Sequence, residues 1–236
     1  MSPEDQPDDR GSSLDVTRRA LLERGAGVAV GITLLGASSA QGAQLLEHAR
    51  AVVDARSAPV ALSATEMSTL KAVLSELLPT DELGPGAVEA GVDVYIDRAL
   101  AGPYKSLRPA YATLLPLFDK AAGAMGGQSF STLSAAKRQS LLSAFEAGKV
   151  MGLSHAQASI ASSGFQMLLG HMREGMFADP MYGGNRAFAG WNLLGFPGVK
   201  LEWSAHDQAL GTKLAPTHKT AKSYGGKPFN GPASTD

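Results

Sequence analysis

The sequence contains no cysteine at any of its 236 positions. The chain alone therefore cannot form a disulfide, a covalently attached c-type haem, an iron–sulfur cluster or a thiolate zinc site. Neither sign of charge is in excess, with 21 Lys and Arg against 22 Asp and Glu, so the composition gives no electrostatic case for a nucleic-acid partner. Aromatic residues make up only 6% of the chain, yet apolar residues at 44% still suffice for one packed domain.

Charged side chains are also missing from residues 25–46. A twin arginine, Arg18-Arg19, lies just before this run, and the small residues Ser38-Ser39-Ala40 and Gln41-Gly42-Ala43 each offer a cleavage site. The arrangement resembles a twin-arginine (Tat) export signal. A transmembrane anchor is the less favoured alternative because glycine and serine weaken the hydrophobicity of the run, and an ordinary cytosolic helix is another. We expect residues 1–43 to be a Tat-type signal region, residues 44–62 a linker, and the protein to be periplasmic.

The rest of the sequence has the pattern of an all-α protein. Ser63 and Glu66 have the spacing of a capping box, and apolar residues follow at helical intervals as far as Pro79. We expect further helices over residues 85–101, 104–125 and 156–174, and one from Ser134 to about residue 148. Prolines within 104–125 predict a kink or a split there. No alternating strand pattern of useful length appears. The prediction is a single helical domain of about five helices over residues 63–200, with an extended tail over residues 201–236.

The last helix is followed by a segment rich in glycine and aromatic residues, over residues 179–198. It has too much glycine for a regular element, and we expect it to be irregular. Its aromatic side chains combine large area with low rotamer entropy, which suits an interface. The residues predicted to contact a partner are Asp179, Tyr182, Gly183, Gly184, Asn185, Arg186, Trp191, Phe196 and Pro197.

This segment resembles the hallmark of a known family, the small subunit (subunit 3) of gluconate 2-dehydrogenase and related flavoprotein dehydrogenases. The pattern is D-P-x-Y-G-G-N-R, then G-W and G-[FY]-P-G, and it is present between Asp179 and Gly198. The resemblance covers roughly residues 60–200, including the Pro79-Thr80-Asp81 loop and the Pro85-Gly86-Ala87 stretch.

The resemblance implies an accessory role. Such subunits associate with a large FAD-containing subunit of the glucose–methanol–choline (GMC) oxidoreductase type, and a multihaem cytochrome c subunit commonly completes the complex. The small subunit carries the folded flavoprotein through the Tat translocon. The family places no catalytic residue, metal or cofactor on the small subunit, so FAD and haem c are expected on partner subunits. The substrate is not implied.

Other interpretations of single residues are weaker. His171 and Glu174 lie three apart on one helix, but a di-iron bundle needs more such pairs, so a partly buried or surface histidine is preferred. Gly183-Gly184 lacks a phosphate-loop pattern. Asp179 is expected to cap a turn, with Arg186 as its ion-pair partner.

Two other functions stay open, and so do two conformations of the C-terminal tail. One function is a helical enzyme with an unrecognised site, and the other is a free-standing sugar-binding module with Trp191 and Trp203 as stacking platforms. From Gln208 to Thr235 the chain has no acid. That stretch is either a solvated tail or an arm across the partner anchored by Tyr224 and Phe229.

Overall fold

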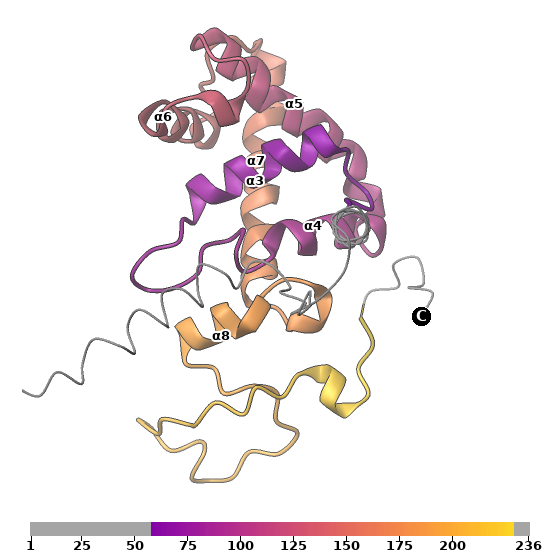
Figure 1. Ribbon diagram of the computed structural model, residues 1–236, viewed down its shortest axis with the longest axis vertical. Helices are drawn as coiled ribbons and strands as arrows, with labels where there is room; N and C mark the ends of the chain where they lie inside the picture. Colours follow the sequence, from indigo (N-terminus) through magenta and orange to yellow (C-terminus); the bar gives the residue numbers. More distant parts are fainter. Residues whose placement is uncertain (1–57, 229–236) are drawn as a thin grey trace, which may run out of the picture. The chain divides into compact units, whose positions relative to one another are not determined.

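The computed structural model describes residues 58–228. These residues belong to one compact unit that begins at Ala58. The expected signal region, residues 44–57 of the expected linker, and Phe229 lie outside the described residues. Within residues 58–228 there are six α-helices and no strand, so the all-α prediction is confirmed (Figure 1). None of the helices in this part of the chain is long and apolar enough to cross a membrane.

The longest of the six helices contacts four of the others. The six helices are α3 (Ala64–Leu77), α4 (Val92–Ala101), α5 (Arg108–Ala124), α6 (Ala135–Glu146), α7 (His155–Phe177) and α8 (Ala189–Leu194). Helix α7 has 23 residues and contacts α4, α5, α6 and α8, while α3 packs on α4 and α5 (Figure 1). Short 3-10 turns lie at Lys105–Leu107, Phe130–Thr132, Pro180–Tyr182, Arg186–Phe188 and Ala221–Tyr224.

Local capping decides where α3 begins. The Ser63 hydroxyl accepts the N–H of Glu66, and the Glu66 carboxylate accepts the N–H of Ser63 at 2.7 Å, so the predicted capping box is confirmed. The carboxylate of Asp97 also binds the backbone just before this helix. Asp97 is buried in α4 and accepts three successive backbone N–H groups, those of Val60 at 2.6 Å and of Ala61 and Leu62 at 2.9 Å each. The entry into α3 is therefore fixed by α4.

The helix expected over residues 85–101 begins later than predicted. Helix α4 starts at Val92, after Gly91, whose φ of 77° is left-handed. The preceding residues form turns instead, because the Ala87 N–H donates to the distant Leu78 carbonyl at 2.9 Å. Gly86 lies so close to that chain that an added Cβ would be 2.5 Å from the same oxygen. The predicted start at Pro85 is wrong for this tertiary reason.

Pro109 acts as the sequence predicts, whereas Pro116 does not interrupt its helix. The stretch expected over residues 104–125 is split into a 3-10 turn and α5, which begins at Arg108 with Pro109 in its first turn. Pro116 lies inside α5 on its exposed face. Aromatic rings then join α5 to its neighbours, with Phe118 stacked on Phe145 at 4.0 Å between ring centroids. This stack forms part of the core between α5, α6 and α7.

Candidate functional site

The hallmark segment folds back onto the end of α7. Asn185 lies at its centre, completely buried, with a left-handed φ of 46°. Its Nδ2 donates to the Ala178 carbonyl at 2.8 Å, and its Oδ1 accepts the Gly190 N–H at 2.8 Å. Asparagine tolerates this backbone conformation better than most residues. One side chain thus joins the end of α7 to the start of α8, and the six-residue α8 corrects the expectation that the whole segment is irregular.

Trp191 makes the second link to α7. Its indole Nε1 donates to the Phe177 carbonyl at 2.9 Å, and only 4% of the residue is exposed. Phe177 is the last residue of α7, where carbonyls have no partner within the helix. The ring also packs edge-on against Phe196 at 4.9 Å. Trp191 is therefore too buried to be a sugar-stacking platform, whereas Trp203, the other tryptophan of that alternative, is 41% exposed.

The glycines of the segment allow backbone to approach backbone. A Cβ on Gly184 would lie 2.1 Å from the Gly175 carbonyl oxygen, and one on Gly190 would lie 2.0 Å from the Met176 carbonyl oxygen. Both contacts are to backbone of α7, which cannot swing aside as a flexible side chain could. The Gly-Gly and Gly-Trp parts of the motif are therefore packing requirements within this chain.

Asp179 joins the segment to the C-terminal part of the chain. Its Oδ1 accepts the Met181 N–H at 2.9 Å, which confirms the expected turn cap, and its Oδ2 accepts the Ala221 N–H. Asp179 and Arg186, both within the described part of the chain, do not form the expected ion pair. Instead the Arg186 backbone N–H donates to the Ala90 carbonyl at 2.9 Å, while its guanidinium lies beside Gly91.

The remaining predicted interface residues differ in exposure. Arg186 is exposed, Tyr182 and Phe196 are half-buried, and Pro197 is buried. The Pro197 carbonyl accepts the Thr217 N–H at 2.7 Å, so the tail returns to this segment in place of running free in solvent. A partner role for the nine residues stays a prediction. Their observed contacts show that they shape this end of the molecule from within.

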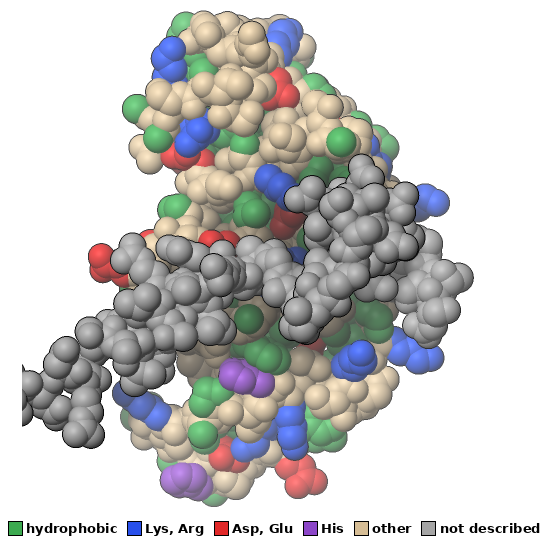
Figure 2. Space-filling model, in the orientation of Figure 1, with side chains coloured by type: hydrophobic (Ala, Val, Ile, Leu, Met, Phe, Trp, Pro, Cys, Tyr) green, Lys and Arg blue, Asp and Glu red, His purple; other side chains and the backbone are tan. Residues whose placement is uncertain are grey.

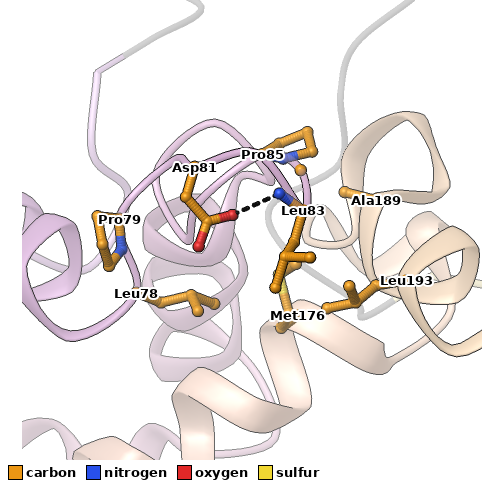
Figure 3. A pocket seen from close by; sticks show the side chains of 9 residues that line it. Leu78, Pro79, Asp81, Leu83, Pro85, Met176, Ala189 and Leu193 are labelled. Atoms are coloured by element: carbon orange, nitrogen blue, oxygen red, sulfur yellow. Dashed lines mark hydrogen bonds between the residues drawn. The ribbon is translucent and has the colours of Figure 1, made fainter.

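An apolar pocket lies beside the segment (Figure 3). It is lined by Leu78, Pro79, Asp81, Leu83, Gly84, Pro85, Met176, Ala189 and Leu193. Asp81 is the one ionisable residue in that lining, and its Oδ1 already accepts the Leu83 N–H at 2.8 Å. The Leu83 and Leu193 side chains are exposed at its edges. The pocket suits an apolar group and offers no set of acid, base and nucleophile.

A polar cluster inside the helical body was not predicted as a unit. His171 is buried, its Nδ1 lies 2.9 Å from the Tyr111 hydroxyl, and its ring stacks on Tyr104 at 4.7 Å. Glu174 accepts the hydroxyls of Tyr104 and Tyr95 at 3.0 Å each. These residues come from α4, the turn after it, α5 and α7. The cluster therefore ties α7 to the other three by hydrogen bonds within the core.

Burial sets the protonation of this cluster. It raises the pKa values of the Tyr95 and Tyr111 phenols well above their usual range, and the charge of Glu174 adds to the effect. Burial also lowers the pKa of His171, with a smaller opposing effect of Glu174. The phenols thus stay protonated, and a neutral imidazole is favoured. Over residues 58–228, no three His, Asp or Glu side chains are grouped so that they could hold a metal ion.

One comparison identifies the family of this all-α chain. The family model described as gluconate 2-dehydrogenase subunit 3 matches residues 64–198, more than half of the chain. The match runs from the first residue of α3 to the end of the hallmark segment. The chain belongs to the gluconate 2-dehydrogenase subunit 3 family. No curated protein and no solved structure matches it.

Proposed function

We propose that this chain is the non-catalytic small subunit of a periplasmic, FAD-dependent sugar or alcohol dehydrogenase complex of the gluconate 2-dehydrogenase kind. The family match over residues 64–198 carries the proposal, because subunit 3 belongs to such an oxidoreductase complex. Its partners are a large flavoprotein of the GMC type and, in complexes that include one, a multihaem cytochrome c. The chain assists assembly of the flavoprotein and its passage through the Tat translocon.

The cofactors belong to the partners in this proposal. FAD is bound by the large subunit, and haem c by the cytochrome. The absence of cysteine from the whole sequence supports this division, since covalent attachment of haem c needs cysteine thiols. Within the described part of the chain, the Tyr, His and Glu side chains of the cluster inside the helical body also bond to one another, which supports a structural role for them.

Export supplies the experiment that tests the proposal. Arg18→Lys combined with Arg19→Lys is expected to leave both this chain and the flavoprotein in the cytoplasm, because the flavoprotein crosses only as a passenger. Cell fractionation followed by dehydrogenase assay of each fraction gives the result. Arg10→Lys with Arg24→Lys is the matched control, and it is expected to export normally. A flavoprotein that reaches the periplasm beside the twin-arginine variant would contradict the passenger role.

A further inference from the structure

We propose that the C-terminal loop, residues 200–216, together with the exposed end of α8, is the surface that docks onto the flavoprotein subunit. The inference rests on the proposed function and adds the location and chemistry of the contact. It is carried by three features of the described residues: a loop of fixed shape, large apolar side chains that this shape leaves in solvent, and an excess of lysine around them.

The loop is closed at its base by hydrogen bonds. The Val199 N–H donates to the Lys219 carbonyl at 2.8 Å, and the Thr217 N–H and Oγ1 donate to the Pro197 carbonyl at 2.7 and 2.8 Å. The Tyr224 hydroxyl reaches the Val199 carbonyl at 3.3 Å. These bonds bring the two ends of the loop together beside the hallmark segment, below α8 in Figure 1.

The interior of the loop is also held by polar contacts. Ser204 and Asp207 bond reciprocally, with the Ser204 N–H donating to the carboxylate at 3.0 Å and the Asp207 N–H to the hydroxyl at 3.2 Å. Lys200 forms an ion pair with the same carboxylate. The Lys200 and Ser204 contacts lower the pKa of Asp207 to about 2, so the ion pair persists at neutral pH. Leu201 and Leu210 take no part in these contacts, whereas the Trp203 ring lies under the Lys200 ammonium, whose Nζ is 5.0 Å from the ring centroid.

Those apolar side chains face solvent. Leu201 is 72% exposed, Leu210 is fully exposed and Trp203 is 41% exposed, while Leu194 at the end of α8 is 64% exposed. Of the ten large apolar side chains exposed in the described part of the chain, six lie between Leu193 and Tyr224. Such concentration marks an interaction surface, since isolated apolar residues scatter over the whole surface. A preformed loop also loses little conformational entropy on binding.

Charge indicates the kind of partner. The loop itself has two lysines, Lys200 and Lys213, and two acids, Glu202 and Asp207, and the residues that close and follow it add three more lysines and no acid: Lys219, Lys222 and Lys227. Figure 2 shows basic, acidic and apolar side chains intermixed over the lower part of the face in view, where this segment lies. A depression at the loop base is lined by Lys200, Leu201, Glu202, Thr217, Lys219 and Tyr224. It fits an apolar side chain flanked by carboxylates.

A second copy of this chain is the poorer occupant of the surface. In a two-fold dimer each patch meets its own equivalent, so lysines would face lysines. A protein partner with an apolar patch and an acidic rim meets no such repulsion. Membership of the subunit 3 family implies other dehydrogenase subunits as partners, and in the proposed complex the flavoprotein is the one that this surface contacts.

The test uses the complex isolated from its native host through a tag at the C-terminus of this chain. Flavin retained per tagged chain is measured after washes of increasing salt concentration. Leu201→Ser with Leu210→Ser is expected to weaken retention about tenfold or more, as loss of anchor residues does at interfaces. Met151→Ser with Ile160→Ser is the matched control, because these side chains are 71% and 46% exposed and lie outside the surface. The control is expected to retain flavin as the wild type does.

Three other results would overturn either the docking surface or the proposed function. Full retention by the Leu201 and Leu210 variant, with the same thermal midpoint as wild type, would overturn the proposed surface. Absence of flavin from the wild-type preparation would overturn the proposed function itself. The tagged chain is also floated with vesicles of phosphatidylglycerol. Variants that lose flotation but keep the flavoprotein would assign the surface to the membrane and overturn the inference.

Discussion

Asn185 and Trp191 show how single hallmark residues stabilise the fold. Both side chains bond to the end of α7, a place where backbone carbonyls lack helical partners. Both are buried, so substitutions here act first on folding. A loss of assembly on Trp191→Ala would therefore not distinguish a missing contact from an unfolded subunit. The exposed residues of the C-terminal loop are the better probes of assembly.

Asn185→Ala is expected to lower the free energy of unfolding by about 3 kcal/mol. The change leaves the Gly190 N–H and the Ala178 carbonyl without their side-chain partner, and each unsatisfied buried group costs about 1–3 kcal/mol. Urea unfolding measures the effect. Asn185→Asp keeps the acceptor but sets an unpaired buried carboxylate against the Ala178 carbonyl, so its stability at neutral pH is expected to be no higher than that of the alanine variant. Wild-type stability in the alanine variant would show that this side chain does not hold the segment.

Two helical glycines are expected to respond to alanine in opposite ways, because one touches backbone of another helix and the other has open space beside it. Gly190→Ala is expected to destabilise the protein by several kcal/mol or prevent folding, because its Cβ would overlap the Met176 carbonyl. Gly170→Ala has open space around it inside α7 and is expected to stabilise by about 0.5–1 kcal/mol. Thermal unfolding of the two variants gives the comparison. Equal midpoints would contradict the packing explanation.

His171 makes stability depend on pH. Burial lowers its pKa below the usual 6.5, so below that pH the unfolded chain binds a proton that the folded chain excludes. The free energy of unfolding is therefore expected to fall as the pH decreases through about 6.5 towards the lowered pKa. Urea unfolding from about pH 8 to about pH 5.5 tests this. His171→Gln should show a flatter profile over that range, and an unchanged slope would contradict the assignment.

Capping and long-range contacts act together at the scale of the helix. Ser63 and Glu66 cap the start of α3 locally, while Asp97 of α4 accepts the three N–H groups of residues 60–62, just before it. Helix α7 is likewise begun by a box of Ser154 and Gln157 and ended by the hallmark segment. Both helices thus begin at a capping box of adjacent residues, and residues outside the helix supply a further contact to each.

Asp97→Asn is expected to lower the free energy of unfolding by about 1–3 kcal/mol, because a neutral amide accepts fewer of the three backbone donors and its own N–H₂ group opposes one. Hydrogen exchange at residues 60–62 should rise at the same time, while exchange within α7 changes less. Asp81→Asn, on an exposed loop, is the control and is expected to leave stability nearly unchanged. If the amides of residues 60–62 stayed as protected from hydrogen exchange in the Asp97 variant as in the wild type, the proposed role of Asp97 would be contradicted.

Local sequence signals predicted where helices begin and end better than they predicted which residues meet across the fold. The capping box of α3 and the break before Arg108 follow from a few adjacent residues, and both were predictable from sequence. The late start of α4 was not, because it depends on the bond from Ala87 to Leu78. The Tyr, His and Glu cluster was missed for the same reason, since Tyr95 and Glu174 are 79 residues apart. Only the fold shows that they meet.

At the scale of the whole molecule, the described chain has two regions with different surfaces, a helical body and a C-terminal loop. The helices and the hallmark segment form a body around one apolar core, in which Arg108 Nη1 is a buried side-chain nitrogen without a hydrogen-bond partner among the described residues. The C-terminal loop presents apolar and charged side chains to solvent. This division suits a subunit whose function is to hold a partner. The family, the helical class and the hallmark segment were all recognisable from sequence, whereas the exposed loop was visible only as a lysine-containing tail.

The most direct test of the central claim is the flavin content of the native complex. The tagged chain is purified from membranes and periplasm of its host, and its absorption spectrum and subunit composition are measured. Stoichiometric flavin on a co-purifying GMC-type subunit, active as a sugar or alcohol dehydrogenase, is the result expected of an accessory subunit. A colourless chain without that partner, from cells with active dehydrogenase in the flow-through, would contradict it.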